Sequence, residues 1–347
     1  MNYKVTLGSA ENGKELVWSV RTNPHAYLSG KSGSGKSYKL RELIAQLPGQ
    51  GIRCIVCDCS NDLSFALKEG FGANLPLDVL DLRSGEFSMN PLESMQLTEE
   101  EWESAVDISS RFAETLRAAY HLHDAQMVYL SNAAKEFLMS GRTPRSVQGL
   151  ISYIRSDPEL LKRTQTALYR LENLAGIVRC GEYNYDWKKQ LSSPGITVIK
   201  FDTIQDEFQQ SLLVELLLGE LWNQKMEIKD GIPVVLVLDE CQKFRFRDSG
   251  FLMKILREGR KYNIAGWFSS QWVSDKNAVA ALNQADLQLY FQPDFDHAHA
   301  LARRLSAGEK KRMIQYEKAL NGLGVGQFIF KRADSNPIIS KQLRLEQ

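Results

Sequence analysis

The chain contains Gly30-Lys31-Ser32-Gly33-Ser34-Gly35-Lys36-Ser37, which matches the pattern G-x-x-x-x-G-K-[ST]. The stretch follows a short predicted strand, Ala26–Leu28, and opens a helix predicted from about residue 36 to residue 47. Glycines let such a loop turn so that successive backbone N–H groups point inward at phosphate oxygens, and the helix N-terminus adds its partial positive charge. We therefore predict that residues 30–37 bind the phosphates of a nucleoside triphosphate. A flexible surface turn is the alternative, and the strand–loop–helix context argues against it.

Two side chains of this loop have specific predicted roles. Lys36 is expected to bridge the β- and γ-phosphates and so to take part in catalysis as well as binding. The Ser37 hydroxyl is expected to bind Mg²⁺.

A second part of the same site is predicted where Val234–Leu238 runs into Asp239 and Glu240. Apolar residues on both faces of this run indicate a strand in the centre of a sheet, and open α/β sheets place their ligands at the carboxyl ends of such strands. We expect Asp239 to contribute to Mg²⁺ binding and Glu240 to polarise the attacking water. A solvated acidic pair in a turn is the alternative, and the phosphate loop upstream makes it less favoured.

A third set of candidates follows this strand. Arg257 and Arg260 are three residues apart on a helix predicted over residues 249–262, so they are neighbours on one face. A fixed planar cation suits cleavage of a γ-phosphate and can come from the next subunit of an oligomer. Surface ion pairs, for example with Glu258, are the structural alternative. Gln271 follows the next predicted strand, beside the expected position of Glu240, where it could sense the γ-phosphate.

The order of predicted elements indicates an α/β fold with a mostly parallel central sheet. Strands are expected at residues 26–28, 52–57, 196–201, 232–238, 264–268, 287–291 and 325–330, and a small N-terminal hairpin at residues 3–7 and 16–20. Helices alternate with these strands near residues 206–228, 249–262 and 295–305. On the strand 52–57, Cys54 points away from the face shared by Cys57 and Cys59, which favours core thiols over a metal site.

Strand signals fade between residues 93 and 190, where helix signals dominate. Thr98 and Glu101 form a predicted capping box ahead of a helix at residues 102–120, and Asp157-Pro158 is a predicted start for a helix at residues 159–174. We interpret this block as an all-α insertion. The predicted organisation is thus a hairpin and the first half of the core at 1–92, the insertion at 93–190, and the second half of the core at 191–347.

Composition restricts the class of protein. The chain has 347 residues, 43% hydrophobic and 24% charged, which is enough for a substantial core and excludes disorder as the dominant state. Five cysteines, an odd number, favour reduced thiols over a disulfide framework. Residues 1–14 lack a signal-peptide pattern, and the apolar runs are well short of the roughly 18 residues of a membrane helix. We therefore expect a cytoplasmic protein without a membrane anchor.

Charge is balanced overall but not locally. Lys and Arg total 43 against 42 Asp and Glu, so generic polyanion binding is not indicated. Between Lys243 and Lys261, however, seven basic residues accompany only Asp248 and Glu258. Such a patch could contact phosphates, but on charge alone solvated helix faces are at least as good an interpretation.

These motifs together resemble the HerA/FtsK superfamily of ring-forming, DNA-pumping ATPases, and most of all its conjugative and type IV secretion members. The likeness is carried by residues 24–37, by Leu236-Val237-Leu238-Asp239-Glu240, by Arg257-Glu258-Gly259-Arg260-Lys261 and by Phe268-Ser269-Ser270-Gln271. The N-terminal hairpin, the final strand and the helical insertion are also similar in kind and place. The resemblance implies a RecA-like P-loop NTPase core, hydrolysis of ATP with Mg²⁺ at subunit interfaces, usually hexamers, and translocation on DNA.

Two functions are therefore considered. The first is a homo-oligomeric motor, a hexamer by preference, that threads DNA, with conjugative transfer or DNA processing as the candidate process. The alternative is an ATPase switch or scaffold that regulates a protein partner, such as a secretion-channel component or a defence nuclease, without pumping DNA. A regulatory GTPase is disfavoured because no Asn-Lys-x-Asp stretch is present to recognise guanine.

Overall fold

The structure of the chain is a computed structural model. It describes residues 1–10, 12–60, 63, 76–84, 87–98, 100–120, 123–181, 183–201, 203–228, 231–248, 250–332 and 337–339.

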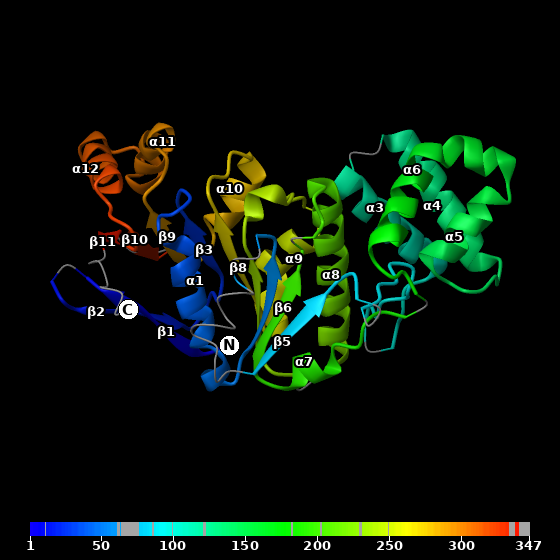
Figure 1. The fold of residues 1–347 in the computed structure, drawn as a ribbon, viewed down its shortest axis with the longest axis horizontal. Helices are drawn as coiled ribbons and strands as arrows, with labels where there is room; N and C mark the ends of the chain where they lie inside the picture. The colour runs from blue at the N-terminus through cyan, green and yellow to red at the C-terminus, as the bar shows by residue number, and fades with distance from the viewer. Residues whose placement is uncertain are drawn as a thin grey trace.

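A mostly parallel sheet forms the centre of the molecule (Figure 1). Within the described ranges it has nine strands in the order β11-β10-β9-β3-β8-β7-β4-β6-β5. The strands from β9 to β5 in this order are parallel, whereas β10 and β11 are antiparallel to their neighbours. Their bounds are β3 Ala26–Ser29, β4 Arg53–Asp58, β5 Leu77–Asp81, β6 Gly195–Lys200, β7 Val234–Leu238, β8 Ile264–Ser270, β9 Leu287–Phe291, β10 Phe328–Arg332 and β11 Ile338–Ile339. The predicted α/β class is confirmed.

The continuous apolar runs are the central strands. Every residue of β4, β7 and β8 is buried, as expected for parallel strands that are covered on both faces. The two faces belong to two cores: Cys54 and Val56 pack in one, and Cys57 and Cys59 in the other. The described cysteines are buried free thiols, and burial raises the pKa of Cys57 to about 12. The expectation of core thiols agrees with this packing.

The N-terminal hairpin pairs β1, Tyr3–Ser9, with antiparallel β2, Glu15–Val20, as the sequence predicted. It is attached to the sheet by an aromatic cluster in which Trp18 lies 6.0 Å from Trp267 between ring centroids. The Trp18 indole N–H also donates to Asp286 at 2.8 Å.

Helices surround the sheet and also form a separate group. Around the sheet lie α1 Lys36–Ala45, α7 Lys188–Ser192, α8 Glu207–Glu227, α9 Phe251–Glu258, α10 Lys276–Leu282, α11 Phe295–Leu305 and α12 Lys310–Asn321. The insertion contributes α3 Ala105–Tyr120, α4 Asp124–Met139, α5 Val147–Arg155 and α6 Pro158–Ile177. Figure 1 shows this second group together at one end of the molecule, with α11 and α12 at the opposite end. Among the described helices, none combines the length and apolar character required to cross a bilayer.

The start of α3 corrects the predicted capping box. The helix begins at Ala105, and Ser104 and Asp107 form the capping box. The Ser104 N–H donates to the Asp107 carboxylate at 2.9 Å, and the Asp107 N–H donates to Ser104 Oγ at 3.3 Å. Glu103 lies before the helix, where its carboxylate accepts from the Met95 N–H and from Arg111. The other predicted start is confirmed, since the Asp157 carboxylate caps α6.

A buried carboxyl group fixes the start of α9. Glu215 of α8 is buried, and its Oε2 accepts the Phe251 N–H at 2.7 Å. Burial raises the pKa of Glu215 to about 7, more than the hydrogen bonds from the start of α9 lower it. A pKa raised in the folded state gives stability that is complete below pH 4.5 and is lost as the pH rises through about 7.

Glu215→Gln is therefore expected to remove a pH dependence of stability. Between pH 5 and pH 8, the free energy of unfolding of the native protein should fall relative to the variant by up to about 3 kcal/mol, because each pKa unit corresponds to about 1.4 kcal/mol. Urea unfolding at several pH values measures this free energy of unfolding. The control is Glu207→Gln, which changes an exposed carboxylate on the same helix. Parallel pH profiles for native protein and Glu215→Gln would show that this carboxyl group is not shifted.

Candidate functional site

The predicted phosphate loop connects the carboxyl end of β3 to the start of α1. It is anchored to both neighbouring strands: the Gly30 N–H donates to the Ser270 carbonyl at 3.2 Å and the Lys31 N–H to the Gln292 carbonyl at 2.8 Å. A Cβ at Gly30 would lie 2.5 Å from the Cβ of Phe291, so only glycine fits where the loop leaves the sheet. The loop is thus held rigidly at the carboxyl edge.

The rest of the loop turns tightly into the helix. Ser34 Oγ donates to the Lys31 carbonyl at 2.7 Å, and Gly35 has a φ of 94°, which favours glycine. The N-terminus of α1 has no side-chain cap, and the first N–H groups of a helix have no intrahelical acceptor. These N–H groups, including those of Lys36 and Ser37, are therefore available to an anion. The Gly326 N–H donates to the Ser34 carbonyl at 2.9 Å and closes the loop from the other side.

Asp239 and Glu240 meet Lys36 across this edge. The Lys36 Nζ lies 4.0 Å from Asp239 Oδ1 and 3.8 Å from Glu240 Oε1. Lys36 is 5% exposed and Asp239 1%, so these two charges face each other out of bulk water, and the Glu240 side chain beside them is 14% exposed. Lys36 of the loop and the acidic end of β7 lie close together, as the sequence predicted.

One oxygen of Asp239 suits a cation. Asp239 Oδ1 is buried and accepts no hydrogen bond from the described residues, while Oδ2 accepts from Ser60 Oγ at 3.4 Å. Mg²⁺ prefers such oxygen ligands, as a carboxylate or a hydroxyl, and keeps several waters. Asp239, together with Ser37 at the start of α1, therefore fits the predicted metal position.

Glu240 stands in a strained backbone conformation. Its φ of 51° is in the left-handed region, which costs a residue of this kind on the order of 1–3 kcal/mol and is concentrated at functional sites. Its carboxylate accepts from the side-chain amides of Gln242 and, at 3.4 Å, of Gln271. Gln271 follows β8, so its predicted position beside Glu240 agrees with the fold.

Among the described residues, neither predicted arginine forms a hydrogen bond or ion pair with Lys36, Asp239 or Glu240. Arg257 is exposed on the last turn of α9 and pairs with Asp248. Arg260 is exposed and has no ion pair within the described ranges. It lies three residues before Asn263, whose carbonyl accepts from the Val234 N–H at the start of β7. Arg260 is therefore near the amino edge, and Lys36 and Glu240 are at the opposite, carboxyl edge.

Two contributors were not singled out from the sequence. Ser60 follows β4, the neighbour of β7, and its hydroxyl reaches Asp239. Gln242 is two residues from Glu240 and holds its carboxylate. Ser60 could have been found from the rule that adjacent parallel strands end at one edge of the sheet. Nothing in the sequence pattern marks Gln242.

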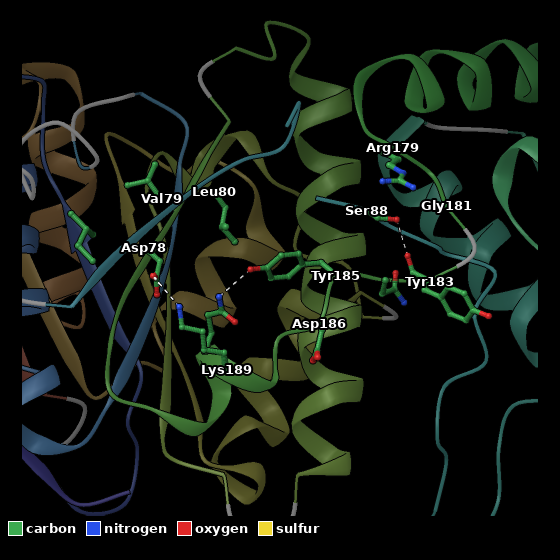
Figure 2. A pocket seen from close by; sticks show the side chains of 13 residues that line it. Asp78, Val79, Leu80, Ser88, Arg179, Gly181, Tyr183, Tyr185, Asp186 and Lys189 are labelled. Atoms are coloured by element: carbon green, nitrogen blue, oxygen red, sulfur yellow. Dashed lines mark hydrogen bonds and ion pairs between the residues drawn. The ribbon is translucent and has the colours of Figure 1, made fainter. Parts of the chain in front are cut away.

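Another cavity lies away from this site (Figure 2). It measures about 770 Å³ and lies between edge strand β5 and residues 179–181 and 183–190. Its contacts are local: Gln190 Nε2 donates to the Tyr185 hydroxyl at 3.1 Å, and Lys189 lies 3.9 Å from Asp78. Tyr185 also stacks on Phe87, with centroids 5.4 Å apart. The cavity contains none of the predicted site residues, and its contacts hold the end of the insertion against the core.

Comparisons with known proteins agree with this architecture. Residues 21–221, more than half of the chain, match the family model described as "Helicase HerA, central domain". No curated protein sequence matches the chain. Among solved structures, VirB4 of Thermoanaerobacter pseudethanolicus has a TM-score of 0.75 and 17% identity, over 99% of this chain and 97% of that one.

The bacterial conjugative coupling protein TrwBΔN70, in complex with sulphate, has a TM-score of 0.63 and 15% identity, over 93% of this chain and 87% of that one. TrwB in complex with ADP and Mg²⁺ has a TM-score of 0.60 and 15% identity, with the same coverage. At these identities the likeness concerns the fold.

Proposed function

The chain belongs to the family of the HerA helicase central domain, and from this premise we propose that it is an oligomeric, Mg²⁺-dependent ATPase that translocates DNA. One observation carries the proposal: the Lys36 ammonium lies within 4.0 Å of the carboxylates of both Asp239 and Glu240. A phosphate loop that meets an acidic strand end is the arrangement that nucleoside triphosphate hydrolysis requires. The solved structures of TrwB in complex with a non-hydrolysable ATP analogue and with ADP and Mg²⁺ support the choice of ligands.

Each residue has a distinct proposed role. The N–H groups at the start of α1, including those of Lys36 and Ser37, and the Lys36 ammonium hold the phosphates, and Ser37 and Asp239 would hold Mg²⁺. When bound, this ion neutralises charge on the β- and γ-phosphate oxygens. The oxygen of a water molecule attacks the γ-phosphorus, and Glu240 accepts the proton that this water loses. The bond between the γ-phosphorus and the β,γ-bridging oxygen breaks in the same step. Gln271, hydrogen-bonded to Glu240, responds to the γ-phosphate.

The arginines suggest why hydrolysis would require assembly. Since Arg260 lies near the amino edge of its own sheet, it does not complete the site of its own subunit. An exposed guanidinium presented at a subunit boundary is suited to the γ-phosphate of a neighbour in a ring. We assign this role to Arg260 before Arg257, because Arg257 is already paired with Asp248.

Mixing two inactive variants tests this assignment. Arg260→Ala is expected to lose about 1,000-fold or more of the ATP turnover, and Lys36→Ala about 100-fold or more. When they are assembled together, about a quarter of the interfaces combine an intact lysine with an intact arginine, so phosphate release should return. Arg257→Ala, treated in the same way, is expected to lose far less activity. A mixture that stays inactive although the subunits co-assemble would contradict a role in trans.

A further inference from the structure

The central sheet ends at β5, whose outer edge has no partner strand among the described elements. The Ile196 N–H of β6 donates to the Pro76 carbonyl at 2.8 Å, which fixes how β5 faces β6. Successive residues of a strand direct their backbone groups to opposite sides, so residues 76, 78 and 80 face β6. Leu77 and Val79 therefore direct their N–H and C=O groups away from the sheet.

These outward backbone groups are not used elsewhere in the described part of the chain. There, no loop, helix or side chain forms a hydrogen bond with the N–H or C=O groups of Leu77 and Val79. The edge stops at Asp81, because the Ser84 N–H donates to the Asp81 carbonyl at 2.9 Å and closes a turn. Two donors and two acceptors, about 6.6 Å apart along the strand, are thus left for another extended backbone.

The cavity of about 770 Å³ borders this edge (Figure 2). All of residues 77–80 line it. Alternate side chains of a strand point to opposite faces of its sheet, so four consecutive lining residues mean that the backbone edge of β5 forms this wall. Figure 2 shows Asp78 and Leu80 directed toward Lys189 and Tyr185 on the other side of the cavity.

The opposite wall is held in place by its own hydrogen bonds. The Met89 N–H donates to the Arg179 carbonyl at 3.0 Å, and the Tyr185 N–H donates to the Ser88 carbonyl at 2.9 Å. The Ser88 hydroxyl donates to the Tyr183 carbonyl at 2.7 Å. Since these groups are bonded within the wall, the wall stands beside β5 without pairing with it.

One buried side chain of the cavity has an unused acceptor. Gln190 lines the cavity and is 3% exposed, and its Nε2 donates to the Tyr185 hydroxyl at 3.1 Å. Its Oε1 is buried without a donor among the described residues. A buried acceptor without a donor is unfavourable, and a ligand that carries an N–H or O–H group would relieve it.

The charges of the cavity favour a ligand without a large net charge. The described lining contains two carboxylates, Asp78 and Asp186, and two cations, Arg179 and Lys189. Asp78 already lies 3.0 Å from Arg53 and 3.9 Å from Lys189. This balance does not select a polyanion or a polycation. A peptide backbone is neutral, and its alternating donors and acceptors match those of a strand edge.

The space beside β5 suits a single strand better than a second copy of the chain. Pairing of two β5 edges across a twofold axis would bring a second sheet and a second wall of residues 179–181 and 183–190 to the same place. The wall of the first copy already stands there. An isolated extended segment needs only the room between this wall and the edge.

We propose that β5 accepts an extended peptide segment of another protein as an additional strand. The segment is hydrogen-bonded to Leu77 and Val79, places an apolar side chain against Leu80 and donates from another side chain to Gln190 Oε1. This goes beyond the proposed function, because it assigns a protein partner and does not require ATP hydrolysis. Since the opposite wall includes the end of the predicted insertion, the bound strand contacts the core and the insertion together.

A phage-displayed library of random twelve-residue peptides, selected on the full chain and counter-selected on Val79→Pro, tests this proposal. Proline lacks an N–H, and at position 79 the missing N–H belongs to the outer edge, so the ladder with β6 stays intact. In fluorescence anisotropy, a selected and labelled peptide should bind Val79→Pro at least about 10-fold more weakly than the native protein.

The matched control is Val79→Ala, which removes the side chain but keeps the N–H. It should bind the peptide within about two-fold of the native protein, a difference below about 0.4 kcal/mol. A library that yields no peptide with a preference for the native protein over Val79→Pro would overturn the proposal. So would a peptide that loses as much affinity with Val79→Ala as with Val79→Pro.

Ester substitution in the selected peptide tests strand pairing on the native protein, so it does not depend on the folding of a variant. Replacing one backbone amide by an ester removes a single N–H without adding bulk. Affinity should fall by about 5- to 10-fold at alternate residues, whose N–H groups face β5, and should change far less at the residues between them. Equal effects at all positions would overturn the proposed pairing.

Sedimentation velocity of Val79→Pro without peptide tests the other occupant. The variant should assemble like the native protein, and a smaller assembly would assign the edge to a second copy and overturn the proposal. Failure of the proposed ATPase would appear differently, as absent phosphate release by the native protein. The peptide comparisons would still decide whether β5 accepts a strand.

Discussion

Lys36→Ala is expected to weaken ATP binding by about 10- to 100-fold, which corresponds to the 1.5–3 kcal/mol of a hydrogen bond to a charged group. Turnover should fall by about 100-fold or more, because the ammonium is aimed at charge that develops as the γ-phosphate leaves. Isothermal titration with a non-hydrolysable ATP analogue measures the first effect, and phosphate release measures the second.

The same substitution also affects stability, so a control is needed. Removing Lys36 leaves the buried Asp239 beside Glu240 without their shared cation, which should lower the thermal midpoint. Lys39→Ala is a matched control, because Lys39 is also a buried lysine of α1 but pairs with Glu42 at 2.5 Å. It should cost stability and leave ATP affinity nearly unchanged. Equal losses of affinity in the two variants would mean that the effect of Lys36 is only structural.

Glu240→Gln is expected to retain ATP binding and to lose turnover by about 100- to 10,000-fold, the usual contribution of a positioned general base. The amide keeps the size of the side chain and its place near Gln271, but it cannot accept the proton of the attacking water. Single-turnover hydrolysis with saturating enzyme separates this loss from any change in binding.

Two carboxylates serve as comparisons for Glu240. Asp239→Asn should weaken Mg²⁺-dependent nucleotide binding itself, because the predicted metal ligand loses its charge. Asp81→Asn changes an exposed carboxylate at the same edge of the sheet, at the end of β5, and should leave turnover unchanged. Normal hydrolysis by Glu240→Gln would remove Glu240 from its assigned role.

The core of the fold follows from local patterns that the tertiary structure reinforces. The strands buried on both faces, β4, β7 and β8, are nearly continuous apolar runs, and such runs have few alternatives to a central parallel strand. The juxtaposition of Lys36, Asp239 and Gln271 could be predicted for a related reason. Each follows the carboxyl end of a parallel strand, and those ends lie along one edge.

The elements that were not predicted have weaker local signals. β5, Leu77–Asp81, is a half-buried edge strand that pairs only with β6 in the described sheet, so its sequence is not uniformly apolar. α10 and α12 are short or polar helices, and most of α12 is exposed. Their positions depend on contacts with distant segments, which a local pattern does not contain.

Prediction of the site from the sequence is limited in the same way. Nothing in the periodicity near residue 240 indicates that Gln242 would fold back onto Glu240, because that contact depends on the positive φ of Glu240. The role that we propose for Arg260 depends on a second subunit, so the sequence pattern of one chain does not contain it. The division of the chain at residues 93 and 190 likewise stays a prediction, although helices α3–α6 all fall between those positions.

Phosphate release from ATP, measured over a range of protein concentrations with and without Mg²⁺ and with single- or double-stranded DNA, tests the central claim most directly. The account predicts turnover that requires Mg²⁺, rises per subunit as the subunits assemble, and increases further with DNA. Folded protein that releases no phosphate at any concentration, or that releases it equally well after Lys36→Ala, would contradict it.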